Sequence, residues 1–297
     1  MSKQFNMAEQ PDFPCRIILE STNLCNLHCP SCMTGQGIRP EKGRMDFGLF
    51  KKIVNELVDH PETFFMSLQG GGEPLLHPEL FDFLAYLHQK KPGIRSQLST
   101  NATLLTEEKS IKLLESGLVE IFFSVDGATR ETFEILRAGA EFDKVLVNIN
   151  RFLELKKELA ASVTTGVCMV RQKANEAEIP AFEEYWQDRV DQIIYATYID
   201  YAGSINDRRT SEDKALTPEK RYFCKQLARA DCSVDFMGRV NLCCKSVGED
   251  LCIGNLTDNT MAELFSGPKR AGVIQLHKEG RWDELPSCRA CHQGWSF

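Results

Sequence analysis

Three cysteines near the start of the chain have the spacing of a metal-cluster site. The stretch CNLHCPSC places the thiols of Cys25, Cys29 and Cys32 close together. Three such thiolates can hold three irons of a [4Fe–4S] cubane, and the missing fourth ligand leaves one iron open, as in a catalytic site. A zinc knuckle or half of a zinc finger is the alternative, but zinc requires four ligands, usually in two close pairs, and no second pair lies nearby. The spacing therefore favours iron–sulfur over zinc.

A glycine-rich motif, Gly71-Gly72-Glu73-Pro74, follows later in the chain. Glycines let a ligand approach the backbone closely, Glu73 offers an acceptor for an ammonium group, and Pro74 stiffens the turn. Alone, this motif would indicate a plain turn from strand to helix with a surface glutamate. The cysteine triplet just after an apolar strand, followed by this motif, resembles the radical S-adenosylmethionine (radical SAM) superfamily.

This resemblance implies both cofactors and chemistry. In that family the open iron of a [4Fe–4S] cluster is chelated by the amino and carboxylate groups of S-adenosyl-L-methionine (SAM). The reduced cluster then cleaves SAM to methionine and a 5′-deoxyadenosyl radical. The resemblance assigns Cys25, Cys29 and Cys32 to the cluster, and the Gly71–Pro74 motif to the amino group of SAM.

Four further polar residues are candidates for contacts with SAM. Asn101, Ser124 and Asp126 end predicted strands, where family members bind ribose hydroxyls or the methionine carboxylate, and Arg137 stands where many members bind that carboxylate. The alternatives are a helix cap at Asn101, a turn at Asp126 and a helix-surface arginine at Arg137. One position departs from the family: Ser31 replaces the aromatic residue that usually precedes the third cysteine near the adenine.

Alternating strands and helices predict the scaffold that positions these residues. Helical patterns with a period of 3.6 lie between short apolar runs rich in Ile, Val, Phe and Thr. Serial β/α units imply a parallel sheet, and ligands bind at the carboxyl ends of such strands, where the motifs fall. Six units are too few for a closed barrel, and the resemblance implies an α/β fold with an open (β/α)6 partial TIM barrel. The predicted strands are Ile17–Glu20, Thr63–Gln69, Ile94–Ser99, Val119–Val125, Val163–Val170 and Gln192–Ile199.

Composition excludes several classes of protein. The chain has 297 residues, 42% hydrophobic and 26% charged, which is ordinary for a globular protein. A net charge of −7 gives no general attraction to nucleic acid or anionic membranes. No apolar run is long enough for a membrane span, and residues 1–14 lack the apolar segment of a signal peptide. The 12 cysteines are therefore expected to be thiols and metal ligands in a cytoplasmic protein.

The tail carries a second cysteine set. We expect an N-terminal tail at 1–14, the partial barrel at 15–200, a linker at 201–220 and a small cysteine-rich module at 221–297. The tail resembles the short twitch form of the SPASM extension, which implies one auxiliary [4Fe–4S] cluster bound by Cys224, Cys243, Cys288 and Cys291. Cys232 in place of Cys224, a structural zinc ion, and haem attachment at the CRACH sequence of residues 288–292 are the alternatives.

The chemistry follows from what becomes of the substrate radical. Three outcomes fit this architecture: oxidation of an alcohol to a ketone with the auxiliary cluster as electron acceptor, epimerisation with a thiol as hydrogen donor, and modification of a ribosomal peptide. Because the first strand begins by residue 16, with no leader-recognition domain before it, we expect a small polar substrate. A non-catalytic iron–sulfur or zinc protein is the alternative outside enzymology.

Between these outcomes, the sequence favours epimerisation of a sugar or aminocyclitol. Three cysteines of the tail lie outside the expected set of auxiliary-cluster ligands: Cys232, Cys244 and Cys252. Of these, Cys252 is the candidate hydrogen donor. Free cysteines are also common as small buried hydrophobic residues, which is the alternative for all three. A flavodoxin or ferredoxin would reduce the cluster.

Overall fold

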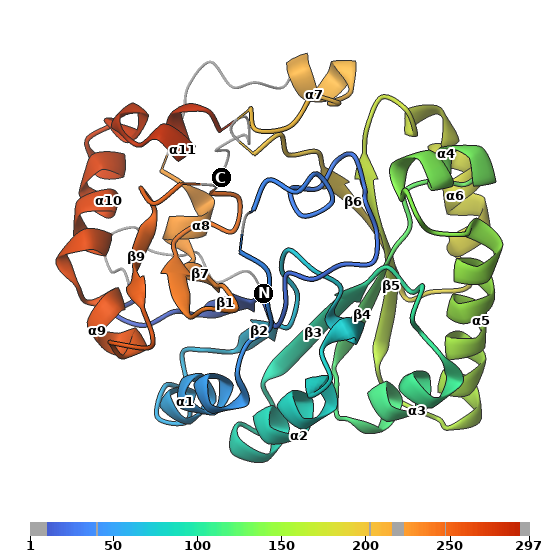
Figure 1. Cartoon of the computed structure of the whole chain (residues 1–297), viewed down its shortest axis with the longest axis horizontal. Helices are drawn as coiled ribbons and strands as arrows, with labels where there is room; N and C mark the ends of the chain where they lie inside the picture. Colours follow the sequence, from blue (N-terminus) through green and yellow to red (C-terminus); the bar gives the residue numbers. More distant parts are fainter. Residues whose placement is uncertain (1–10, 40, 202, 216–222, 247, 292–297) are drawn as a thin grey trace.

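The computed structural model describes residues 11–39, 41–201, 203–215, 223–246 and 248–291 (Figure 1). Its strands form a single open sheet in the order β6-β5-β4-β3-β2-β1-β7-β8-β9, with β6 at one edge and β9 at the other. The first six strands are parallel. Their bounds are β1 Arg16–Leu19, β2 Phe65–Ser67, β3 Arg95–Thr100, β4 Glu120–Ser124, β5 Thr164–Arg171 and β6 Gln192–Thr197.

Helices cover the outer face of this curved sheet, and the loops after the strands gather on its inner side (Figure 1). Several of these helices begin at a side-chain cap, such as Asp46 for α1 and Thr106 for α3. The helices of the barrel are α1 Phe47–Leu57, α2 Leu80–Lys90, α3 Glu107–Glu115, α4 Arg130–Leu136, α5 Phe142–Glu158 and α6 Ile179–Trp186, with 3-10 turns η1 Pro74–Leu76 and η2 Glu176–Glu178. Repeated β/α units with right-handed crossovers produce this arrangement.

The cysteine-rich tail extends the same sheet. Strand β7 (Asp231–Val234) pairs parallel with β1, and β8 (Arg239–Asn241) and β9 (Cys252–Asn255) follow as antiparallel strands. The predicted module is therefore continuous with the barrel through the β1–β7 pair. The remaining elements are α7 Ser211–Ala215, α8 Lys225–Ala228, α9 Met261–Phe265, α10 Pro268–Lys278, η3 Trp282–Glu284 and α11 Pro286–Arg289.

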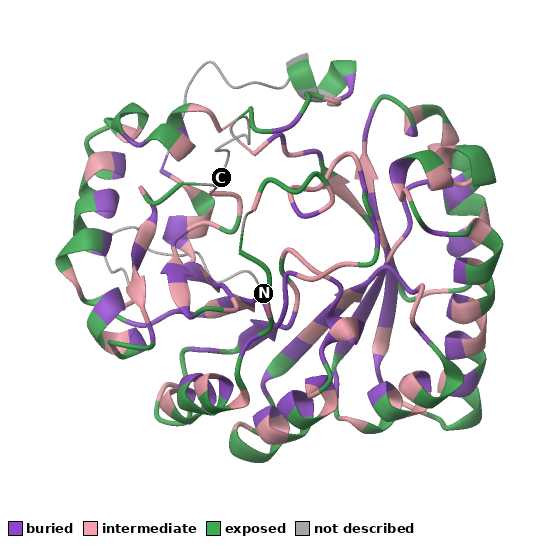
Figure 2. Cartoon of the chain, viewed as in Figure 1, coloured by how far each residue is buried: buried purple, intermediate pink, exposed green. Residues whose placement is uncertain are grey.

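The core lies between the sheet and the helices that cover it (Figure 2). Buried residues run along the strands and along one side of each long helix, such as Phe50, Val54 and Leu57 of α1. Burial of this apolar surface, worth about 25 cal/mol per Å², is the main stabilising contribution. No helix in the described part of the chain has the length and apolar composition that crossing a membrane requires.

The open α/β barrel predicted from the sequence is confirmed, and each of its six predicted strands is present with ends shifted by at most two residues. Within the expected linker the structure contains the short helix α7. Residues 202 and 216–220 of that linker, and the N-terminal tail up to residue 10, lie outside the described residues.

Candidate active site

The cysteine triplet lies in the loop that follows β1, at the carboxyl edge of the sheet. Cys25, Cys29 and Cys32 all line one cavity of about 590 Å³. The loop is tightly folded: Cys32 N donates to Cys29 O at 3.2 Å, and a side chain at Gly35 would collide with the Cys29 backbone. The Leu27 amide approaches Cys25 Sγ at 3.5 Å. The local fold thus presents the three thiols to a shared space.

Burial shapes the ionisation of these thiols. It raises the pKa of Cys25, and it raises that of Cys29 to about 11. A coordinated metal deprotonates thiols outright, so bound iron would hold these buried sulfurs in the thiolate form. Among the described residues, no three His, Cys, Asp or Glu side chains converge as they would around a single metal ion. In a cubane each cysteine binds a different iron, so the triplet suits a cluster better than one zinc ion.

The glycine motif forms a cradle beside this loop. A Cβ atom at Gly71 would lie 2.8 Å from Glu20 Oε2 and 2.9 Å from Thr34 Oγ1. At Gly72 it would lie 2.5 Å from the Thr22 carbonyl oxygen. Only glycine permits this close approach of β2's end to the cysteine loop. Both glycines line the cavity, so their backbone groups are exposed to a ligand there.

Glu73 connects the ends of two strands. Its Oε1 accepts from Leu75 N at 3.1 Å and from the Thr100 hydroxyl at 2.7 Å, and its Oε2 accepts from Asn101 N at 2.8 Å. Burial raises the pKa of this carboxyl group. Three donors use most of its acceptor capacity, so Glu73 shapes the glycine cradle, and because it also lines the cavity its contact with the SAM amino group stays a prediction. Pro74 begins the 3-10 turn η1 directly after it.

Asn101, at the carboxyl end of β3, contacts the cysteine loop. Its Nδ2 donates to Asn26 Oδ1 at 3.1 Å and lies 3.9 Å from Cys25 Sγ. Its Oδ1 accepts from the Thr103 amide at 3.0 Å. Asn101 thus orients the loop as well as lining the cavity, which Ser124 at the end of β4 also lines.

Asp126 and Arg137 form a buried ion pair. Arg137 Nε lies 2.7 Å from Asp126 Oδ2, and Asp126 Oδ1 accepts from Val170 N at 2.7 Å. Asp126 is only 1% exposed, whereas Arg137 lines the cavity. Of these two predicted SAM contacts, only Arg137 reaches the cavity, and Asp126 holds it in place. The charge of Asp126 raises the pKa of Arg137 against the opposing effect of burial.

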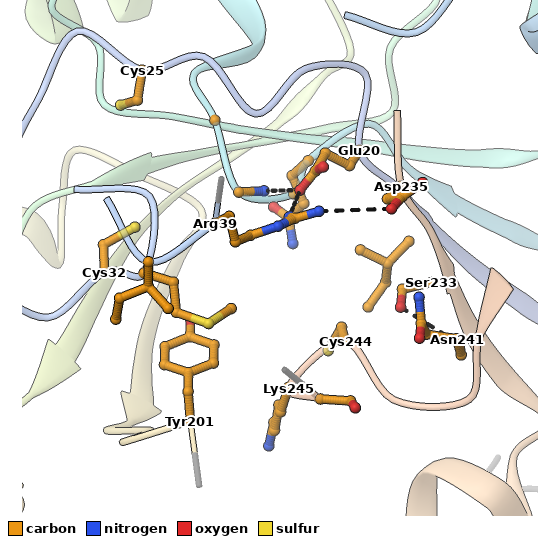
Figure 3. A pocket seen from close by; sticks show the side chains of 18 of the residues that line it. Glu20, Cys25, Cys32, Arg39, Tyr201, Ser233, Asp235, Asn241, Cys244 and Lys245 are labelled. Carbon is orange, nitrogen blue, oxygen red and sulfur yellow. Dashed lines mark hydrogen bonds and ion pairs between the residues drawn. The ribbon is translucent and has the colours of Figure 1, made fainter. Parts of the chain in front are cut away.

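A second wall of the cavity carries a polar cluster that the sequence did not reveal. Glu20 directly follows β1, and its Oε2 lies 2.5 Å from Arg39 Nη1 and accepts from Gly71 N at 2.7 Å. Arg39 Nη2 lies 3.7 Å from Asp235 Oδ2, just beyond β7. Figure 3 shows Glu20, Arg39 and Asp235 together beside Ser233 and Asn241 of the tail strands. Sequence reasoning missed them because their pairing depends on β1 lying next to β7.

The expected auxiliary ligands surround a separate cavity of about 160 Å³. Cys224, Cys243, Cys288 and Cys291 all line it. Burial raises the pKa of Cys224 to about 11 and raises that of Cys243 as well. Cys232, the alternative to Cys224, lies instead in the core on β7 and is only 2% exposed. The structure thus brings together the four cysteines of the predicted set.

The remaining thiols of the tail differ in where they lie. Cys252, at the start of β9, and Cys244 both line the larger cavity. Cys252 Sγ is 3.7 Å from the Gly254 carbonyl oxygen, to which it donates, and burial raises its pKa. Cys243 lines both cavities, so the expected auxiliary centre lies next to the larger one.

Two protein-family models match the chain. That of the Radical SAM superfamily covers residues 19–185, and that of SPASM, an iron–sulfur cluster-binding domain, covers residues 224–292. Both domains agree with the two cysteine sets described above.

Three related proteins match this chain over part of their own length. The tungsten-containing aldehyde ferredoxin oxidoreductase cofactor-modifying protein of Pyrococcus furiosus is 29% identical over 70% of this chain and 62% of its own length. Mycofactocin maturase MftC of Mycobacterium tuberculosis is 30% identical, over 58% of this chain and 41% of its own. Fe-coproporphyrin III synthase of Methanosarcina barkeri is 27% identical, over 69% and 49%. The chain thus spans less than two thirds of each of these relatives.

Solved structures share the fold. BtrN in complex with AdoMet and 2-DOIA has a TM-score of 0.64 at 18% identity, covering 95% of both chains. AnSMEcpe with bound AdoMet has a TM-score of 0.69 at 20% identity, covering 94% of this chain and 90% of that one. Streptococcus suis SuiB bound to its precursor peptide SuiA has a TM-score of 0.72 at 15% identity, covering 96% and 72%. At these identities the likeness concerns the fold alone.

Proposed function

This chain belongs to the radical SAM superfamily and carries a SPASM domain, and from that premise we propose that it epimerises a carbon of a small polar substrate such as a sugar or aminocyclitol. Its cofactors are SAM, a SAM-binding [4Fe–4S] cluster and auxiliary iron–sulfur centres. When bound and reduced, the first cluster supplies a 5′-deoxyadenosyl radical from SAM. In our assignment Cys25, Cys29 and Cys32 hold that cluster, and Arg137 faces the SAM carboxylate.

One observation carries the proposal: Cys252 lines the same cavity as the three N-terminal cysteines. A hydrogen donor must be a thiol and not a thiolate, and burial raises the pKa of Cys252. The Sγ atom also donates to Gly254 O, which orients the S–H bond. After the first abstraction, Cys252 would return its hydrogen to the opposite face of the substrate carbon. The resulting thiyl radical would be restored by one electron from a flavodoxin or ferredoxin and one proton from solvent.

The size and lining of the cavity support a small polar substrate. Cavities of about 300–1,000 Å³ ordinarily hold one small ligand. SAM would occupy much of the 590 Å³ here, which leaves limited room for a second molecule. The wall next to the glycine cradle is lined by Glu20, Arg39, Asp235 and Asn241, whose polar atoms suit hydroxyl or amino groups.

Oxidation of an alcohol to a ketone is the second candidate function. The position of Cys243 favours it, because this residue lines both the large cavity and the auxiliary one. The electron leaving the substrate radical would pass by way of Cys243 to the auxiliary cluster, which would accept it, while a base removed the hydroxyl proton. BtrN, crystallised with AdoMet and 2-DOIA, shares this fold over 95% of its length.

Turnover in deuterium oxide distinguishes the two reactions. Epimerisation by a thiol predicts solvent deuterium at the inverted carbon, because the S–H of Cys252 exchanges with water. Oxidation predicts a ketone. Cys252→Ala should abolish inversion while 5′-deoxyadenosine is still released, and Cys244→Ala, on the same cavity wall, is the matched control. Undiminished inversion by Cys252→Ala would end the donor assignment.

A peptide substrate and a non-catalytic role are tested separately. The reduced holoprotein, mixed with SAM, should release 5′-deoxyadenosine, and a failure to do so would favour a non-catalytic iron–sulfur or zinc protein. Stimulation of that release by a ribosomal peptide, and by no sugar or aminocyclitol, would move the substrate to the peptide class, to which the SuiA-bound SuiB belongs.

A further inference from the structure

We propose that Glu20 and Gln69 form the substrate-recognition subsite of the large cavity, and that they bind a hydroxyl or ammonium group. This inference rests on the proposed function and adds the chemistry by which the substrate is recognised. Both residues line the cavity at the carboxyl ends of neighbouring strands, β1 and β2. Neither belongs to the cysteine loop; Glu20 lies against the glycine cradle through its bond from Gly71 N, and Gln69 directly precedes the cradle in the chain.

One oxygen of Glu20 lacks a partner. Its side chain is 7% exposed, and Oε2 is occupied by Arg39 Nη1 and Gly71 N. The other oxygen, Oε1, is buried with no hydrogen-bond partner among the described residues. A buried acceptor without a donor costs about 1–3 kcal/mol, so such an atom in a cavity wall indicates a ligand that donates to it.

Gln69 supplies a second acceptor of the same kind. Its Oε1 atom is also buried without a partner among the described residues. Adjacent strands carry these two oxygens, so a ligand with neighbouring hydroxyl groups, or an ammonium beside a hydroxyl, can satisfy both. A carboxylate or phosphate would instead place its own oxygens against them, which the subsite disfavours.

The acid that shares Arg39 with Glu20 is already engaged. Asp235 Oδ1 accepts from Met237 N and from Arg239 N, both at 3.0 Å, and Asp235 Oδ2 lies 2.6 Å from Arg239 Nε. Asp235 therefore serves the turn between β7 and β8 and, through Arg39, the position of Glu20.

Glu20→Gln inverts the polarity of the subsite with little change in shape. The amide oxygen can keep the bonds of Oε2 to Gly71 N and Arg39, which leaves the NH₂ group as a donor in place of Oε1. Glu41→Gln is the matched control, because Glu41 lines the same cavity but its side chain is 45% exposed. Its Oε1 atom makes a long ion-pair contact, 3.7 Å from Arg239 Nη1. Iron content and the thermal midpoint verify that both variants are folded and loaded.

The experiment measures binding by calorimetry to the oxidised, SAM-loaded holoprotein, so no turnover is needed. The probes are myo-inositol, glucosamine and 2-deoxystreptamine, with glucuronate as the acidic comparison. We expect at least one probe to bind the wild type, and Glu20→Gln to weaken it by roughly tenfold or more. Glu41→Gln should remain within about twofold, and the dissociation constant of SAM should be the same in all three proteins.

The outcomes separate the possible sources of the donor group. Equal probe affinity in Glu20→Gln and wild type would refute the subsite and leave the proposed function standing. A tenfold loss of SAM affinity in Glu20→Gln would show that the carboxylate serves the SAM ammonium group, which also refutes it. If no probe binds the wild type, the small polar substrate is wrong and the subsite assignment fails with it.

Discussion

We expect Asp126→Asn to weaken SAM binding indirectly, through the position of Arg137. The two oxygens of Asp126 are both used, Oδ1 by Val170 N and Oδ2 by Arg137 Nε, each at 2.7 Å. Asparagine can keep the first bond only by presenting its NH₂ group to Arg137, where two donors then face each other. Losing a charge-assisted contact of this kind costs about 1.5–3 kcal/mol, which corresponds to roughly tenfold to a hundredfold in an equilibrium constant. Since Arg137 is expected to face the SAM carboxylate, that loss should appear in the SAM dissociation constant.

The assay compares SAM with decarboxylated SAM on the oxidised, cluster-loaded protein. If Asp126 acts through Arg137, Asp126→Asn weakens SAM and leaves decarboxylated SAM unchanged. Asp143→Asn is the matched control, because Asp143 also pairs with an arginine but at an exposed site, with its side chain 63% exposed. Equal weakening of both ligands would refute the reasoning, since it would mean that Asp126 contacts the ribose or supports the fold generally. An unchanged SAM affinity would remove Arg137 from the site.

Three further predictions follow from the same network of contacts. Glu73→Gln should lower stability by about 1–3 kcal/mol and weaken SAM, because its NH₂ group would face the amide of Asn101, as urea unfolding and calorimetry will test. Burial lowers the pKa of His77, so folding favours the neutral imidazole. The contribution of His77 to the free energy of unfolding should therefore be complete above about pH 6.5 and decrease below it. His77→Gln should reduce this pH dependence, measured as urea midpoints between about pH 7.5 and 5.5. Cys224→Ala should remove the auxiliary cluster's share of the iron, whereas Cys232→Ala, in the core, should retain it.

Local patterns were sufficient to predict the strands and the cysteine loop. Each barrel strand is a short apolar run bounded by polar or turn residues, and each motif is contiguous in the sequence. Parallel β/α topology then brings the strand ends to one edge of the sheet, so the positions of Cys25, Gly71, Asn101 and Ser124 around one cavity follow from topology alone.

Long-range pairing explains what could not be predicted. Nothing near Asp126 in the sequence indicates that Arg137, on the far side of α4, neutralises it and takes its place at the cavity. In the sequence, Glu20 is the last residue of a predicted strand, and no motif of the tail includes Asp235. The two lie near each other only because β7 pairs with β1, a contact between segments more than two hundred residues apart.

The β1–β7 pair also joins the part of the site on the barrel to the part on the tail strands. Leu19 lies opposite Val234, and the Glu20 amide donates to the Val234 carbonyl oxygen at 2.8 Å, so the sheet register itself sets Glu20 beside the start of the turn that contains Asp235. A second connection lies on the outer face, where Glu56 of α1 accepts from the first amides of α9, Met261 and Ala262, both at 2.9 Å. A slip of one residue in the register would turn every side chain of β7 to the other face. The cysteine loop, the proposed substrate wall and the SPASM strands are therefore positioned by one continuous sheet.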